Sequence, residues 1–259
     1  MTSIHYNRIP AFYNQSLKTI FSAILIFLLS VSPILAQKVV DTAQPFVTYI
    51  ANPHQQSVKL YWKNDSNGIF KSILNLKNWL TKNNSTLVFA MNAGMYTQSN
   101  APLGLYIENH KQITVLNTKT GHGNFYLKPN GVFYLTADNK PFIATSDKFV
   151  ANGNIKYATQ SGPMLVINGK IHPALKKGSA NLNIRNGVGI LPDNTILFAM
   201  SKTAISFYDF ANYFKKMGCR NALYLDGFVS RTYLPEKNWI QTDGNFGVII
   251  GVTKIKNRN

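Results

Sequence analysis

Residues 185–226 read RNGVGILPDNTILFAMSKTAISFYDFANYFKKMGCRNALYLD, and this stretch decides the fold. It opens with two short apolar segments, 188–191 and 196–200, which are joined by the turn-forming residues Pro192-Asp193-Asn194. Short apolar segments separated by a Pro/Asp/Asn turn are typical of neighbouring β-strands. A third apolar segment, Ala222–Leu225, closes the stretch and predicts a further strand.

Between these strands the sequence predicts an amphipathic helix. Ser206 is followed three residues later by Asp209, an arrangement like a capping box in which Asp replaces the usual Glu. Gly218 fits the position just after the helix end, where a left-handed backbone is common. The apolar residues at helical spacing on one face are Phe207, Phe210, Ala211, Phe214 and Met217.

Outward from this stretch, the chain repeats short apolar segments and turns. Further strands are predicted at 47–49, 58–62, 87–91, 103–107, 112–116, 125–127, 132–135, 164–167 and 246–252. A second helix is predicted from Ile69 to Leu80, with Asn67 as its cap. Turn signatures lie at 109–110, 128–131 and 168–169. Because hairpins outnumber helices, we predict an α+β fold, a single domain with a mixed, hairpin-rich β-sheet core and a few flanking helices.

The first 36 residues have the pattern of a secretory signal. Arg8 and Lys18 precede the apolar run Ile20–Val31, and the segment ends on the small residue Ala36. We therefore expect a signal peptide at 1–36, a mature domain at 37–259, and an exported protein, periplasmic or secreted. The alternative is an uncleaved membrane anchor, because residues 20–36 border on spanning length. Cleavage would leave no stable membrane anchor.

The charge and cysteine content exclude several classes of protein. The chain has 27 Lys+Arg, 10 Asp+Glu and one Cys among 259 residues, and removal of 1–36 leaves a net charge of +15. One cysteine excludes a disulfide framework and a multi-cysteine zinc site, and Cys219 is expected to be buried and inert. No His/Asp/Glu spacing resembles a metal site, so we expect no metal and no cofactor. The lysines are spread evenly without interleaved aromatics, so we expect no nucleic acid partner; the oligomeric state stays open.

Polar residues that could carry chemistry lie where apolar strands begin or end. Asn92 ends the strand at 87–91 and precedes the flexible Ala93-Gly94, while Gln160-Ser161-Gly162 precedes the strand at 164–167. Arg185 opens the stretch quoted above; Asp226 closes it, followed by Gly227 and, four residues after the Asp, Ser230. Each has a structural alternative, since Asn92 and Asp226 could cap turns and Arg185 could pair with any carboxylate. Their number favours a shared cleft.

Six segments in order resemble the phosphodiester glycosidase domain family. Asn92–Tyr96 is similar to its Asn-Gly-Gly-aromatic-Phe segment, and Arg185–Gly189 to its Arg-x-x-hydrophobic-Gly segment. The other four similar segments are Pro102–Gly104, Gly123–Phe125 with Asn124, Gln160–Val166, and Asn221–Gly227 with Ser230. The chain departs from the family where Ala93 replaces a glycine and where Phe228 and Val229 replace two glycines after Asp226-Gly227.

The resemblance implies hydrolysis of a sugar-1-phosphodiester, with a phosphate-bearing carbohydrate as substrate. A phosphomonoester is a good leaving group, so such an enzyme needs fewer carboxylates than an ordinary glycosidase. The resemblance implies that Asp226 is the catalytic carboxylate and that Arg185 clamps the phosphate. It implies substrate-binding roles for Asn92, Gly94, Asn124, Gln160, Ser161, Gly162, Gly227 and Ser230.

Two further interpretations stay open. His122, in Gly-His-Gly just before Asn124, is a weak candidate for an acid–base residue. The high positive charge and the lost glycines after Asp226 also fit a catalytically silent module that binds anionic cell-envelope polysaccharide.

Overall fold

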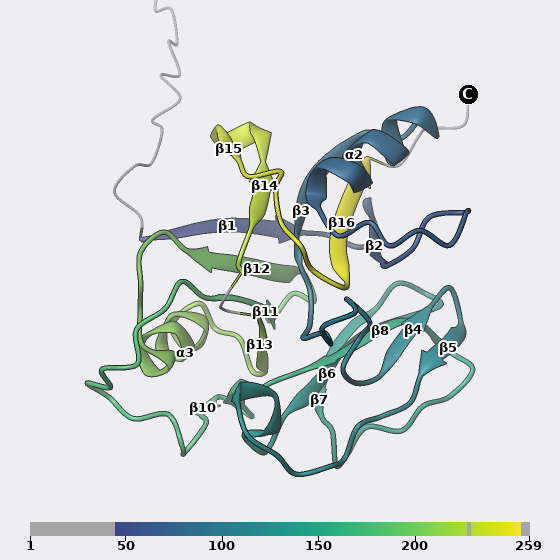
Figure 1. Cartoon of the computed structure of the whole chain (residues 1–259). Helices are drawn as coiled ribbons and strands as arrows, with labels where there is room; N and C mark the ends of the chain where they lie inside the picture. The colour runs from purple at the N-terminus through teal and green to yellow at the C-terminus, as the bar shows by residue number, and fades with distance from the viewer. Residues whose placement is uncertain (1–44, 227–228, 255–259) are drawn as a thin grey trace, which may run out of the picture. The chain divides into compact units, whose positions relative to one another are not determined.

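A computed structural model describes residues 45–226 and 229–254. Their strands form three sheets (Figure 1). The first contains, in spatial order, β1 (Phe46–Ala51), β12 (Ile196–Ser201), β11 (Asn186–Ile190), β13 (Ala222–Asp226), β9 (Met164–Ile167) and β10 (Lys170–Ile171). The second contains β15 (Trp239–Ile240), β14 (Thr232–Leu234), β3 (Leu87–Asn92), β16 (Ile249–Lys254) and β2 (Gln56–Tyr61). The third contains β5 (Lys111–Thr114), β4 (Tyr106–Glu108), β8 (Ile155–Ser161), β6 (Gly131–Thr136) and β7 (Pro141–Thr145).

The sheets share one central hydrophobic core. Phe198 of the first sheet, Phe89 of the second and Phe133 of the third are all buried in it. The rings of Phe89 and Phe198 stack at 5.1 Å, and those of Phe133 and Phe198 meet edge to face at 6.3 Å. Full burial of one such side chain contributes about 1.5–3 kcal/mol, so these contacts hold the three sheets against one another.

Each of the two α-helices in the described part of the chain covers one sheet (Figure 1). Helix α3 (Phe207–Lys216) packs Phe210 and Phe214 against Ala222 and Tyr224 of β13. Helix α2 (Ile73–Lys82) packs its own apolar face on β3 and β16. Two short 3₁₀ helices, η1 (Asn124–Tyr126) and η2 (Pro235–Lys237), lie in connections. Neither α-helix is long and apolar enough to cross a membrane.

Local signals in the sequence are confirmed. The Ser206 hydroxyl accepts a hydrogen bond from the Asp209 backbone N–H at 3.1 Å and donates one to the Asp209 carboxylate at 2.6 Å. Gly218 has φ +88° after the end of α3. The turns at 109–110 and 168–169 join β4 to β5 and β9 to β10, and all four turn residues have positive φ.

Several predictions are wrong. The strand pairings of the described residues are all antiparallel and lie in three sheets, whereas we predicted one mixed sheet core. With two α-helices beside sixteen strands in the part of the chain that the structure describes, the fold is sheet-rich, so α+β overstated the helices. Helix α2 begins at Ile73 with Ser72 as cap, because Phe70 hydrogen-bonds back to Trp62 and Asn67 lies in a turn. Residues 125–127, predicted as a strand, belong partly to η1.

The proposed signal peptide at 1–36 lies outside the described residues. The expected burial of Cys219 is confirmed, and burial raises the pKa of its thiol to about 12. A thiol that stays protonated is a poor nucleophile.

Candidate functional site

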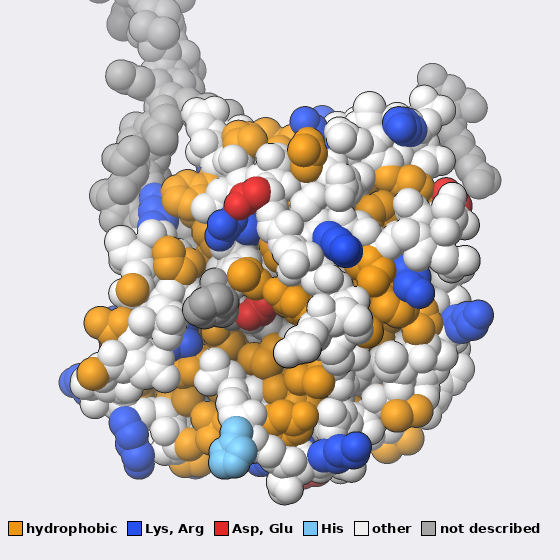
Figure 2. All heavy atoms as spheres, in the orientation of Figure 1, with side chains coloured by type: hydrophobic (Ala, Val, Ile, Leu, Met, Phe, Trp, Pro, Cys, Tyr) orange, Lys and Arg blue, Asp and Glu red, His pale blue; other side chains and the backbone are white. Residues whose placement is uncertain are grey.

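A cavity of about 260 Å³ opens beside the end of β13. It is lined by Met95, Tyr96, Leu103, His122, Gly123, Asn124, Phe125, Tyr126, Asp226 and Val229. Asp226 is the one acidic side chain among these lining residues. The cavity therefore combines a single carboxylate with aromatic and polar walls. On the face of the molecule in Figure 2, Lys and Arg side chains are scattered among uncharged ones instead of forming a stripe.

The backbone of Asp226 is fixed by the sheet. Asp226 pairs across strands with Asn186 of β11, and the register between the strands shifts just after Asn186. The side-chain oxygen of Asn186 accepts a hydrogen bond from the Asp226 N–H at 2.8 Å. Such irregularities at strand ends are common beside active sites because they re-aim a side chain. Here Asp226 as a whole residue remains 8% exposed and lines the cavity.

A buried amide network ties the ends of β3, β11 and β13 together. The Asn186 side-chain NH₂ donates to the backbone and side-chain oxygens of Asn92, at 3.0 and 2.9 Å. The Asn92 side-chain NH₂ lies 3.3 Å from the Asp226 carboxylate, to which it donates. Arg231 N–H donates to the Asn92 side-chain oxygen at 2.9 Å. Asn92 is fully buried and helps to position Asp226; its predicted contact with substrate stays a prediction.

Tyr96 faces the same cavity as Asp226. Burial and the negative charge of Asp226 raise the pKa of Tyr96 to about 12. Its hydroxyl therefore stays protonated at neutral pH and can donate a hydrogen bond. His122 and Asn124 are exposed and line the wall formed by η1 and the residues before it. The structure thus brings these two predicted residues into one cavity with Asp226.

Gln160 holds the chain behind the cavity wall. Its side-chain oxygen accepts hydrogen bonds from the N–H groups of Leu105 and Asn117, and its NH₂ donates to the Asn117 carbonyl and the Ser146 hydroxyl. The side-chain oxygen and NH₂ of Gln160 thus form all their hydrogen bonds within the protein. These bonds support the loop that carries Leu103. It does not line the cavity.

The predicted serines and glycines near Gln160 and Asp226 also make their contacts within the protein. The Ser161 hydroxyl donates to the Leu225 carbonyl at 2.7 Å and the Ser230 hydroxyl to the Asp226 carbonyl at 2.9 Å. Gly162 packs against Asn130 and the Phe125 carbonyl, where a side chain would not fit. Gly94 has φ +79° and lies against Thr159. These residues support the cavity from behind; Gly227 lies outside the described residues.

Arg185 lies away from the cavity, in the layer between β13 and α3. Its side chain is fully buried, and its guanidinium donates to the carbonyls of Ile205 and Asn181 at 2.8 Å each. The guanidinium lies 3.5 Å from the centroid of the Phe207 ring, and burial lowers its pKa while the nearby Tyr224 opposes that change. These contacts give Arg185 a structural role, and its Nη1 is left without a hydrogen-bond partner among the described residues. Arg185 does not line the cavity beside Asp226, and the phosphate clamp stays a prediction.

Comparison with known proteins decides the family. Residues 85–253 match the phosphodiester glycosidase family, and this range contains every described residue of the cavity. The chain belongs to the phosphodiester glycosidase family. The resemblance of the six sequence segments is therefore confirmed.

The proteins similar to this chain differ widely in their sequence identity to it. The uncharacterized protein YigE of Escherichia coli (strain K12) is 41% identical over 225 residues, which cover 85% of this chain and 86% of YigE. The catalytic domain of zebrafish N-acetylglucosamine-1-phosphodiester alpha-N-acetylglucosaminidase, auto-inhibited by its pro-peptide, superposes with a TM-score of 0.54. Its identity is 12%, with 82% of this chain and 89% of the zebrafish chain covered. A protein of Burkholderia pseudomallei K96243 gives a TM-score of 0.53 at 9% identity, with 80% and 73% covered. These two structures show a shared fold.

Sequence reasoning missed Asn186 and Tyr96. Asn186 stands beside Arg185 at the start of an apolar strand, so the rule that singled out Arg185 could also have found it. Tyr96 ends the segment Asn92–Tyr96, but nothing in the sequence places its ring opposite a residue 130 positions away. Among the described residues, no three His, Cys, Asp or Glu side chains gather closely enough to hold a metal ion.

Proposed function

We propose that the protein hydrolyses a sugar-1-phosphodiester, releasing the free sugar and a phosphomonoester. Family membership supports glycosidase-type hydrolysis, and the zebrafish protein of the same fold is named for a sugar-1-phosphodiester. The observation that carries the proposal is Asp226, a carboxylate held by the sheet at the wall of a cavity with aromatic and hydroxyl-bearing neighbours.

In this reaction the bond between the anomeric carbon and the bridging oxygen breaks, and its electron pair leaves with the phosphomonoester. A water oxygen bonds to the anomeric carbon, and the water gives up its proton. Asp226 can accept that proton or stabilise the positive charge that develops on the sugar ring. The low basicity of the phosphomonoester explains why one carboxylate suffices where an ordinary glycosidase uses two.

The leaving phosphate requires donors. Tyr96 keeps its proton at neutral pH and can donate to a phosphate or sugar oxygen. His122 is the residue of the cavity lining that can carry a positive charge, and its exposed position suits the phosphate side of a bound substrate. We propose Asn124 as a further substrate contact on the same wall.

Isotope labelling tests this proposal directly. The purified protein is incubated with a panel of sugar-1-phosphodiesters in H₂¹⁸O, and both products are analysed by mass spectrometry. We expect release of sugar that carries the label, because the glycosidic bond breaks. Label in the phosphate would indicate a phosphodiesterase instead, and no release from any member of the panel would reject the proposed activity.

A silent binding module is the second candidate function, and Val229 favours it. Val229 lines the cavity at a position where the family carries glycine, so it narrows the space beside Asp226. A Val229→Gly variant that gains turnover of one panel member, while the native protein binds that compound without cleaving it, would support the silent module.

We also propose that the protein is exported after cleavage near Ala36. The basic start, the apolar run and the small residue before Gln37 support this proposal. N-terminal sequencing of extracytoplasmic protein should begin near Gln37. Recovery of only full-length protein, in the membrane fraction, would favour the anchor.

A further inference from the structure

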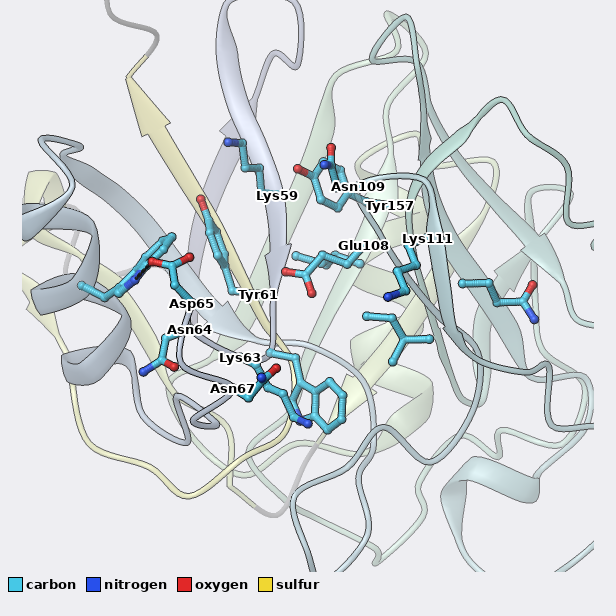
Figure 3. A pocket seen from close by; sticks show the side chains of 15 residues that line it. Lys59, Tyr61, Lys63, Asn64, Asp65, Asn67, Glu108, Asn109, Lys111 and Tyr157 are labelled. Atoms are coloured by element: carbon cyan, nitrogen blue, oxygen red, sulfur yellow. Dashed lines mark hydrogen bonds between the residues drawn. The ribbon is translucent and has the colours of Figure 1, made fainter.

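A second cavity, of about 610 Å³, lies between β2 and the hairpin formed by β4 and β5 (Figure 3). Its volume falls within the range of about 300–1,000 Å³ that is usual for small-molecule sites. It shares no lining residue with the cavity beside Asp226. The sequence reasoning assigned no catalytic or binding role to any residue that lines it.

The aromatic side chains of this cavity are held in place by hydrogen bonds. The indole N–H of Trp62 donates to the Asn100 carbonyl at 2.8 Å, and that of Trp79 donates to the Asp65 carboxylate at 3.0 Å. Both rings remain partly exposed. The buried Tyr157 of β8, in the third sheet, also lines the cavity. Rigid, partly exposed aromatic rings offer flat apolar surface at a low cost in side-chain entropy.

Charged side chains from two sheets meet around these rings. Figure 3 shows Lys59 and Lys63 on one side of the cavity, Lys111 on the other, and the Glu108 side chain extending between them. The Lys63 ammonium lies 4.2 Å from the centroid of the Trp62 ring. Among the described residues, none of these lysines forms a salt bridge within 4 Å. The three lysines outnumber the two acidic residues of the lining, Asp65 and Glu108, and this excess gives the cavity rim a positive potential.

The remaining polar groups suit hydroxyl-rich ligands. Asn64, Asn67, Asn109 and Gln112 line the cavity with amides, each of which both donates and accepts hydrogen bonds. The partly buried carboxylate of Glu108 accepts only, and burial raises its pKa. A sugar combines hydroxyl groups with flat C–H faces, so it can use amides, a carboxylate and aromatic rings together. The two acidic residues of the lining, Asp65 and Glu108, would repel the negative charges of an extended polyphosphate backbone.

We propose that this second cavity binds an anionic glycan, a sugar chain that bears phosphate or carboxylate groups. The aromatic rings contact the sugar faces, the amides and Glu108 contact hydroxyls, and Lys63 and Lys111 contact the anionic groups. We further infer that the same glycan is the polymer cleaved in the Asp226 cavity, and this part rests on the proposed function. Binding of the glycan in the second cavity does not depend on that function.

Tryptophan fluorescence gives a readout located at this cavity. The chain has three tryptophans, two of which, Trp62 and Trp79, line it. The full chain with Trp239→Phe retains these two reporters, and Asp226→Asn slows any cleavage during the titration. The titrants are yeast phosphomannan, which is phosphorylated, polygalacturonate, which is carboxylated, and dephosphorylated mannan, which is neutral.

We expect saturable fluorescence changes with an anionic polymer, and the two anionic titrants distinguish phosphate from carboxylate. In the same background, Lys63→Ala with Lys111→Ala should raise Kd about 10-fold or more, since charge-assisted contacts are lost. The matched control, Lys176→Ala with Lys177→Ala, removes the same charge from exposed positions outside both cavities and should change Kd less than about 2-fold.

Three results would overturn the inference: no fluorescence change with either anionic polymer, equal binding of neutral mannan, or equal Kd changes in both lysine pairs. Failure of the proposed function is a separate outcome. In that case no sugar-1-phosphodiester is cleaved, while fluorescence titration still reports binding in the second cavity.

Discussion

Substitution of Asp226 by Asn separates catalysis from structural support at the first cavity. The change keeps the size of the side chain and leaves the backbone N–H of residue 226 bonded to Asn186 at 2.8 Å. The carboxylate accepts a hydrogen bond from the Asn92 amide at 3.3 Å, which is longer than the usual 2.9–3.0 Å. Weakening this long bond should by itself cost about 1 kcal/mol of folding free energy. For a domain of this size, 1 kcal/mol lowers Tm by about 2–4 °C.

The effect on catalysis should be much larger. If Asp226 takes the proton from water or stabilises the charged sugar ring, Asp226→Asn should lower kcat by about 10²-fold or more, the usual effect of losing a general acid–base group. That factor corresponds to about 2.7 kcal/mol of transition-state stabilisation. Tm and turnover are measured on one preparation, with the best substrate of the panel.

Asp243→Asn is the matched control. Asp243 is an exposed aspartate that pairs with Arg231 at 2.8 Å and does not line the first cavity. Its loss should leave kcat unchanged and Tm nearly so, as for most surface ion pairs. An Asp226→Asn protein with a lower Tm but full turnover per folded molecule would refute the catalytic assignment.

Three further substitutions test the surrounding structure. Arg185→Lys loses the donors to the carbonyls of Ile205 and Asn181 and the contact with the Phe207 ring 3.5 Å away, so it should cost about 2–4 kcal/mol of stability and leave KM unchanged. A 10-fold fall in kcat/KM at unchanged Tm would instead support the phosphate clamp. Gly94→Ala places a methyl group against a hydroxyl at φ +79°, so it should lower Tm more than Gly178→Ala, where φ is +75° but the space is open; equal losses would show that backbone strain alone matters. Burial raises the pKa of Glu108, so the folded protein holds that proton more tightly than the unfolded chain and loses this stability as pH rises through the folded-state pKa; the Tm of Glu108→Gln relative to the native protein should therefore increase from pH 4 to pH 7, and a difference independent of pH would contradict the burial argument.

Predictions of features that depend only on residues close together in the sequence were the most successful. The capped helix after Ser206 and the turns at 109–110 and 168–169 are confirmed, because caps and tight turns need only side chains within a few residues. The start of α2 was placed too early, because Phe70 bonds to Trp62, just after β2, instead of entering the helix. The mixed sheet was wrong for a related reason: apolar periodicity predicts a strand but does not identify its partner.

The features of the candidate site fall into the same two groups, those set by local sequence and those set by tertiary contacts. The sequence by itself determined that Asp226 ends an apolar strand, and the six segments determined the family; both depend on local pattern and order along the chain. Only the tertiary structure decided that Asn186 and Asn92 hold Asp226, that Tyr96 shares its cavity, and that two tryptophans, three lysines and Glu108 line a second one. It also decided that the Gln160 side chain hydrogen-bonds to Leu105 and that the Arg185 side chain hydrogen-bonds to Ile205. These outcomes depend on which strands of different sheets meet, and that is set by burial of the shared core and not by the spacing of any motif.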